Sequence, residues 1–174
     1  MASILKVNTI QDATNSNTAM SIDSSGRVTQ PQHIAFQVTL SNYAGNAGVQ
    51  GTLTFDQVFV NKGSAYNSSN GRFVAPVAGT YFFNFYAFVA GNTSGDKLGN
   101  NSTFRAKFQK NGADHTGFQE IYNIVEAATY NNVSASMIVE LAATDYITVN
   151  VTHSYIYCGG TGSNFNGFNG HLIG

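Results

Sequence analysis

The chain has 174 residues, of which 43% are hydrophobic, 13% aromatic and only 10% charged, whereas a typical globular protein has about 25% charged residues. This length accommodates one ordinary domain with a short extra segment and excludes a two-domain enzyme. Eight Lys and Arg against nine Asp and Glu give a net charge of −1, and outside Arg105–Lys110 the basic residues are scattered, which excludes nucleic acid as a partner. The surface must then consist mainly of Asn, Ser, Thr, Gln and Gly, a composition that suits a rigid extracellular or virion assembly.

The first thirty-two residues differ in composition from the rest of the chain. They begin with the strand-like segment ILKVNTI and continue as a polar run that ends at Pro31. Ser25-Gly26 is a turn signal between two short strands. Because such a stretch cannot bury a core by itself, we predict an N-terminal arm over residues 1–32 and a head domain over residues 33–174. The apolar residues at the start of the arm are Ile4, Leu5, Val7 and Ile10.

Targeting signals and cysteine chemistry are both sparse in the sequence. The N-terminus lacks the long apolar core of a signal peptide, and no run of about 18 apolar residues is present. We therefore expect synthesis in the cytoplasm and no membrane insertion. Cys158 is the only cysteine, which rules out an intrachain disulfide and a Cys-based zinc site, so we interpret it as a structural thiol.

From His33 onward the pattern is that of β-strands. In HIAFQVTL apolar residues alternate with polar or small ones, as a half-buried strand requires. Asn70-Gly71 and Asn111-Gly112 are hairpin signals, and no amphipathic helix is evident. Many short strands with turns every 8 to 12 residues are typical of an all-β, antiparallel sandwich or jelly roll.

Two later segments predict which side chains face a core. In VSASMIVEL one face consists of Val133, Ala135, Met137, Val139 and Leu141. In the following strand the corresponding face consists of Ile147, Val149 and Val151. Because strand side chains alternate, both sets are predicted to be buried together.

The segment TYFFNFYAFVA is apolar on both of its faces. Tyr81, Phe83 and Phe85 point one way, and Phe82, Tyr86 and Phe88 point the other. One face can fill the core of the sandwich. The second needs another cover, either a further layer of the same chain or a neighbouring subunit, and the subunit is the favoured interpretation.

Eight residues stand at fixed spacings: Phe55, Asn61, Tyr66, Phe73, Gly79, Tyr81, Phe83 and Phe85. Together they resemble the complete signature of the C1q domain family. LAATDYITVNV and FNGHLIG resemble later strand motifs of the same family. The resemblance covers residues 33–174 and implies a ten-stranded jelly-roll sandwich that assembles as a homotrimer. The expected core and trimer contacts are Phe55, Tyr66, Phe73, Tyr81, Phe82, Phe83, Phe85, Tyr86 and Phe88.

The chain departs from this family's pattern in three respects. Thr144-Asp145 stands where the family usually has Gly-Asp, a change expected to alter one turn. No collagen Gly-X-Y repeat precedes the domain. The calcium site of some family members is not carried over, because no motif identifies its ligands here.

The arm consists of the leader ILKVNTIQD, an Asn/Ser/Thr spacer and the segment SIDSSGRVTQP. This arrangement resembles the N-termini of bacteriophage tail-fibre and virion appendage proteins. A short N-terminal strand can add to the edge of a sheet on a capsid or tail protein. We therefore expect a virion subunit, a homotrimeric fibre, spike or decoration protein that binds other virion proteins through its arm and adheres to host-surface glycans through its head. The alternative is a cellular C1q/TNF-like soluble recognition module, a lectin or signalling ligand.

The sequence predicts no catalytic residue, metal site or cofactor. The four histidines lie far apart and form no metal-binding spacing. No feature pairs two carboxylates as a glycosidase requires, and the Gly-rich segment 158–170 precedes no helix that could bind phosphate. Tyr43 and Phe165, in loops rich in Asn, Gly and Ser, are candidates for stacking on a sugar, although these loops are equally consistent with tolerant surface.

Overall fold

A computed structural model of the protein describes residues 4–40, 51–90, 102–114, 117, 120–125, 130–153 and 165–174. In this part of the chain every regular element is a β-strand. In chain order they are β1 (Thr9–Gln11), β2 (Thr18–Ile22), β3 (Val28–Thr29), β4 (Ala35–Thr39), β5 (Gly51–Thr52), β6 (Gln57–Lys62), β7 (Tyr66–Asn67), β8 (Arg72–Val74), β9 (Gly79–Ala90), β10 (Ser102–Lys110), β11 (Ala113–Asp114), β12 (Ile121–Val125), β13 (Tyr130–Leu141), β14 (Tyr146–His153) and β15 (Gly167–Leu172). No helix that could cross a membrane occurs among these residues.

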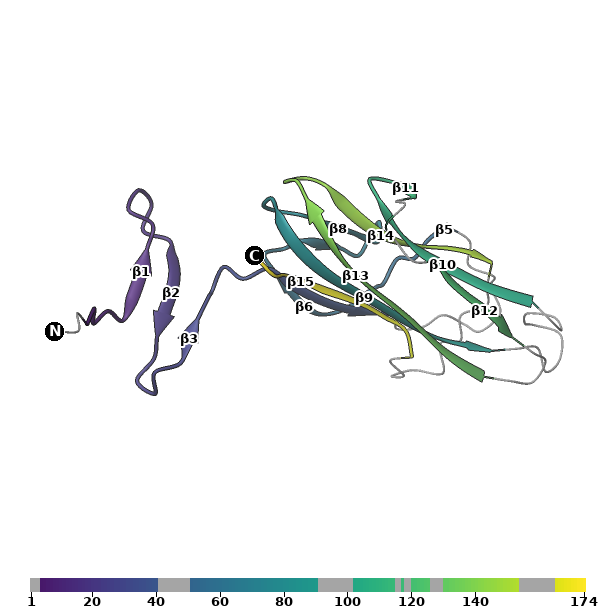
Figure 1. Ribbon diagram of the computed structural model, residues 1–174, viewed down its shortest axis with the longest axis horizontal. Helices are drawn as coiled ribbons and strands as arrows, with labels where there is room; N and C mark the ends of the chain where they lie inside the picture. The colour runs from purple at the N-terminus through teal and green to yellow at the C-terminus, as the bar shows by residue number, and fades with distance from the viewer. Residues whose placement is uncertain are drawn as a thin grey trace.

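The head is a sandwich of two antiparallel sheets, with the arm at one end (Figure 1). One sheet has five strands in the order β13-β9-β15-β4-β6. The other has the order β11-β10-β14-β8-β7, with β12 paired to β10 and β5 paired to β14. The C-terminal strand β15 lies between β9 and β4, which are far from it in sequence. The predicted all-β sandwich is confirmed.

The core lies between the two sheets and consists largely of aromatic rings. Phe36 packs on Phe73 at a centroid distance of 5.0 Å and edge-on against Phe168 at 4.7 Å. Phe73 meets Phe83 at 5.0 Å. Buried aromatic rings remove large apolar areas from water and gain further from offset and edge-to-face contacts. The fully buried large side chains are Tyr81, Phe55, Phe73, Phe83, Phe85, Phe104, Phe168, Leu53, Ile147, Val38 and Val89.

Strand β9 has the two different faces that its sequence predicts. Tyr81, Phe83 and Phe85 are at most 1% exposed and point into the core. Phe82 and Tyr86 lie on the opposite face and are only half-buried. The apolar faces predicted for the segments that form β13 and β14 are likewise buried. Alternation along a strand is a local property, and therefore the sequence alone divides the side chains between two faces, whereas burial in the structure identifies the core face.

The two Asn-Gly pairs lie in hairpin turns, as predicted. Asn111 and Gly112 have φ values of 54° and 78°, the left-handed pair that a two-residue turn between β10 and β11 requires. Gly71, with φ of 71°, ends the turn between β7 and β8, where an added Cβ would lie 2.2 Å from the carbonyl oxygen of Leu53.

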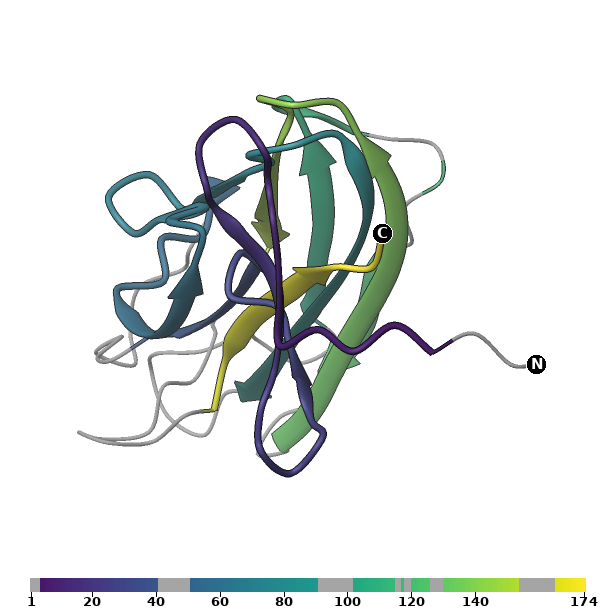
Figure 2. The same ribbon diagram turned by 90° about the vertical axis from the view of Figure 1, so that its left-hand side faces the viewer.

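The arm forms a small sheet of its own, in the order β1-β2-β3. The strand predicted over ILKVNTI is shorter in the structure, since only Thr9–Gln11 is paired. The other two strands lie where the turn at Ser25-Gly26 predicts them. Figure 2, which looks from the arm toward the head, shows the arm as a separate layer in front of the sandwich.

Candidate functional site

The outer face of the five-stranded sheet, which points away from the core, is the candidate assembly surface. Strand pairing arranges its side chains in rows that cross the sheet. One row runs Ile138, Phe82, His171, Ala35, Lys62. In Figure 1 neither the second sheet nor the arm covers this side of the described head. We refer to it below as the outer face.

Aromatic and aliphatic side chains occupy the two ends of the outer face. Ile138 is 67% exposed although its pairing partner on β9 is Phe82. The Phe82 ring packs against the His171 ring at 5.5 Å. Toward the other end of β9, Phe88 stacks on Phe165 at 5.1 Å. These contacts within one chain cover the aromatic rings only in part.

Tyr86 lies flat on β15, where a glycine makes room for it. A Cβ added to Gly167 would lie 2.5 Å from the Tyr86 ring atoms. Because no side chain could occupy that position without moving the ring, Gly167 determines how closely Tyr86 approaches the sheet. The phenol edge then contributes to a flat surface rather than projecting from it.

A polar row crosses the middle of the outer face. Ser136, Asn84, Asn169 and Gln37 face one another across β13, β9, β15 and β4. Beside it an open hollow of about 480 Å³ is lined by Gln37, Val60, Asn169 and His171, together with His33. The outer face therefore combines apolar ends with a hydrogen-bonding centre, and specific protein interfaces likewise combine apolar contacts with hydrogen bonds.

Two histidines come together that the sequence separates by more than a hundred residues. His171 is paired with Ala35 on β4, and the rings of His33 and His171 have centroids 6.2 Å apart. Sequence spacing could not reveal this pair, because a long-range strand pairing creates it. In the described residues no group of three or more His, Cys, Asp or Glu side chains is placed to hold a metal ion.

The signature residues build the scaffold beneath the outer face. The Tyr66 hydroxyl donates to the carbonyl oxygen of Phe55 at 3.2 Å and accepts from the backbone N–H of Phe55 at 3.0 Å. Asn61 bonds both backbone groups of Tyr66, at 2.9 and 3.0 Å. Burial raises the pKa of Tyr66 far above its ordinary value. These positions thus fix the backbone around the core, and Phe55, Tyr66 and Phe73 do not reach the outer face.

A glycine in the last strand allows the core rings to meet. Gly170 is paired with Phe83 on one side and Phe36 on the other. An added Cβ would lie 2.6 Å from Phe83 Cδ1 and 2.9 Å from Phe36 Cε1. The FNGHLI motif thus has a packing role.

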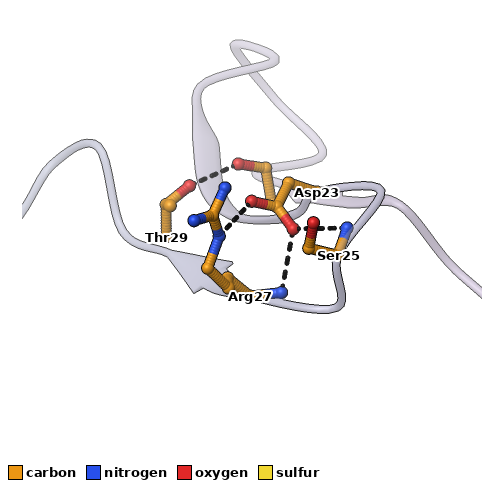
Figure 3. A network of polar contacts seen from close by, with 5 residues as sticks. Asp23, Ser25, Arg27 and Thr29 are labelled. Carbon is orange, nitrogen blue, oxygen red and sulfur yellow. Dashed lines mark hydrogen bonds and ion pairs between the residues drawn. The ribbon is translucent and has the colours of Figure 1, made fainter.

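Three of the four apolar residues at the start of the arm are exposed to solvent. Ile4 and Leu5 are 78% and 82% exposed, Ile10 is 47% exposed, and Val7 is half-buried. Farther along, Asp23 closes the β2–β3 turn by accepting from the N–H groups of Ser25 and Arg27 and by pairing with the Arg27 guanidinium at 2.7 Å (Figure 3). These bonds hold the pKa of Asp23 below its ordinary value.

The structure describes only one of the two residues proposed to stack on a sugar. Tyr43 lies outside the described residues. Phe165 is 39% exposed and packs on Phe88, and its carbonyl oxygen accepts the Phe88 N–H at 3.0 Å. Its ring is therefore already engaged with the outer face.

Comparison with protein families matches the C1q domain to residues 35–173. A segment of 51 residues is 41% identical to the heavy metal-binding protein HIP of Mytilus edulis, covering 29% of this chain and 24% of that protein. The chain therefore spans about a quarter of this relative's length.

Solved structures share the fold at low sequence identity. The globular domain of zebrafish complement 1qA has a TM-score of 0.59 at 17% identity, covering 82% of this chain and 98% of that domain. Murine APRIL has a TM-score of 0.57 at 11% identity, covering 81% and 99%. The TNF protein Eiger of S. frugiperda has a TM-score of 0.52 at 12% identity, covering 82% and 94%.

Proposed function

Because the chain belongs to the C1q domain family, whose domains typically serve as recognition modules rather than enzymes, we propose that it is a non-enzymatic structural and adhesive subunit. Its head assembles as a homotrimer through the outer face of the five-stranded sheet, and its arm tethers the trimer. The observation that carries this proposal is the aromatic and aliphatic surface of β9 and β13 that the chain leaves partly uncovered, with Phe82 half-buried and Ile138 67% exposed.

The composition of the outer face supports a contact between copies. Half-buried rings such as Phe82 and Tyr86 each retain apolar area that a neighbour could cover, and aromatic residues contribute heavily to interface energetics. The central row of Ser136, Asn84, Asn169 and Gln37 supplies donors and acceptors that set the register between copies. Glu140 and Lys62 stand at the ends of their rows rather than at the centre.

A charged substitution on the outer face tests whether this face forms the trimer contact. Ile138 is 67% exposed, so Ile138→Asp costs the single chain little, whereas it puts an unpaired charge into the trimer contact. Light scattering at micromolar concentration should give three times the mass of the chain for the wild type and a shift to monomer for the variant. Tyr122→Asp is the matched control, because Tyr122 is 53% exposed on the opposite sheet. A wild-type monomer, or trimers of both variants alike, would refute the proposed interface.

For the biological context we propose a bacteriophage virion. The support is the arm, whose leader resembles those of tail-fibre proteins and whose Ile4 and Leu5 are available for a capsid or tail protein. The head then faces outward and binds host-surface glycans. Deleting residues 1–32 should abolish incorporation into particles, and a deletion variant that incorporates normally would exclude the arm as the tether.

The alternative is a cellular soluble recognition module. The animal sources of the similar proteins favour it. Gene neighbourhood separates the two: capsid and tail genes beside this one support the virion, and genes for secretion support the cellular module.

A further inference from the structure

One face of the arm sheet gathers four apolar side chains beside the polar pair Gln11 and Thr18, and the other carries hydroxyl and small side chains. Residues directly opposite each other in antiparallel strands share a face. Ile10 is opposite Met20, and Ile22 is opposite Val28. Met20 and Ile22 are two residues apart on β2, so all four apolar side chains lie on the same face.

The opposite face carries Thr9, Ser21 and Thr29, which are aligned across the three strands, together with Ala19. The hydroxyls of Ser21 and Thr29 are hydrogen-bonded at 2.6 Å (Figure 3). This face is therefore suited to water. The pattern of one apolar and one polar face is that of a sheet which packs on something through a single side.

Within the described structure the apolar face of the arm is largely exposed, with Met20 half-buried and Val28 lining an open hollow that it shares with Lys62 of the head. Ile10 is 47% exposed, Ile22 39% and Val28 54%. A sheet of three short strands with its apolar side in water is only marginally stable. The arm nevertheless has well-formed turns, in which Asp12 accepts from the N–H groups of Thr14 and Asn15, and Asp23 closes the next turn.

We propose that the occupant of this face is the same face of two other copies of the chain, so that the three arms form a three-sided bundle with Ile10, Met20, Ile22 and Val28 as its core. This inference rests on the proposed trimer of heads. Cyclic contacts of this kind close around a threefold axis and leave the hydroxyl faces in water.

Charge and chain length both favour copies of the arm over a foreign partner. The apolar face bears no charge: Asp12 and Asp23 lie in the turns, and Arg27 is paired with Asp23. Such a face complements itself. Only residues 30–34 separate β3 from β4, a span of at most about 17 Å. Since β4 belongs to the sheet that bears the outer face, a trimer through that face would keep the three arms close together.

The inference is tested by cross-linking in the full-length chain, with Cys158 replaced by Ser. Met20→Cys places a thiol in the proposed bundle core, and Ala19→Cys places one on the adjacent, opposite face. After mild oxidation, denaturing gels without reductant should show covalent dimers for Met20→Cys at least ten times more abundant than for Ala19→Cys. Light scattering of the same samples before oxidation reports the head trimer independently.

The outcomes separate the two proposals. A trimer in which Met20→Cys forms no more dimer than Ala19→Cys overturns the arm bundle and leaves the head trimer standing. A monomer by light scattering overturns both.

A second pair of variants checks the bundle without a new thiol. Met20→Asp should speed tryptic cleavage after Arg27 by at least tenfold relative to Ala19→Asp, because only Met20 lies in the proposed bundle core. Equal cleavage rates would contradict the bundle.

Discussion

Thr144 occupies a turn position at which the backbone conformation favours glycine. Its φ is 75°, in the left-handed region where a β-branched residue is strained. This is the position at which the resemblance to the C1q family predicts glycine. The turn keeps its bonds, since the Thr144 N–H donates to the carbonyl oxygen of Ala75 at 2.8 Å.

Thr144→Gly should therefore stabilise the protein by about 1 kcal/mol, because glycine adopts this φ without the steric cost. Urea unfolding followed by circular dichroism measures the difference. Thr54→Gly is the control, since Thr54 is exposed at an ordinary φ and should lose stability instead. A Thr144→Gly variant that is less stable than the wild type would show that the threonine is not strained.

Asp145 holds the same turn against the β10–β11 turn. Its carboxylate pairs with Lys110 at 2.9 Å and accepts from Asn111 at 2.7 Å and from the N–H of Ala142 at 2.9 Å. With Lys110 as the largest cause, these contacts lower the pKa of Asp145 to about 2. A lowered pKa means that the folded state favours the charged carboxylate.

The resulting contribution to stability is complete above the ordinary pKa of 3.8 and is lost as the pH falls through about 2. Asp145→Asn should consequently be less stable than the wild type at pH 7, and the gap should narrow toward pH 2. Unfolding free energies measured between these values check this. Asp114→Asn removes a more exposed pair with Lys107, with Asp114 59% exposed, and should have a smaller effect. A constant gap across the pH range would exclude the proposed linkage.

At the scale of elements, β15 connects the two halves of the five-stranded sheet by pairing with both β9 and β4. It enters last in sequence but lies between β9 and β4, so it supplies contacts to the core and to the outer face at once. Gly167 admits the Tyr86 ring on one face, and Gly170 admits Phe83 and Phe36 on the other. The two glycines thus serve opposite faces of one strand.

Gly170→Ala should destabilise the protein by about 2 kcal/mol or more, because the new Cβ would lie 2.6 Å from the backbone oxygen of Phe82 as well as from Phe83. Thermal or urea unfolding measures the loss. Gly174→Ala, at a position with no atom within 4 Å, should be neutral. Equal stability of the two variants would mean that β15 shifts to accept the methyl group.

At the scale of the whole molecule, the head and the arm are built on different principles. The head has an aromatic core between two sheets. The arm has hydrogen-bonded turns, but its apolar side chains are largely exposed. Among the described residues, no buried core residue precedes Ile34. We therefore expect the head to fold without the arm.

Deleting residues 1–32 should leave the near-ultraviolet circular dichroism of the head unchanged per mole of chain. All nine tyrosines follow residue 32, so this signal reports the head alone. If the deletion abolished the tyrosine signal, the arm would have to contribute to the head's packing. The full-length chain at the same concentration is the reference.

The sequence by itself determined the properties that repeat locally. Alternation divided the β9 side chains between two faces and identified the buried residues of β13 and β14, and Asn-Gly pairs located two hairpin turns. The C1q signature could be read because its residues hold the backbone around one core at fixed spacings. For the candidate site, alternation also predicted a second aromatic face that needs a cover, and the structure shows that Phe82 and Tyr86 lie on it.

Only the tertiary structure decided which strands lie side by side. The pairing of β15 with β4 and β9 brings His171 to His33 and aligns Asn169 with Asn84 and Gln37. Short β12 was not anticipated, and β1 is shorter than its apolar sequence predicted. Pairing between distant strands depends on the whole chain's topology, whereas face alternation depends only on neighbouring residues. That difference is why the faces could be predicted and the rows across the outer face could not.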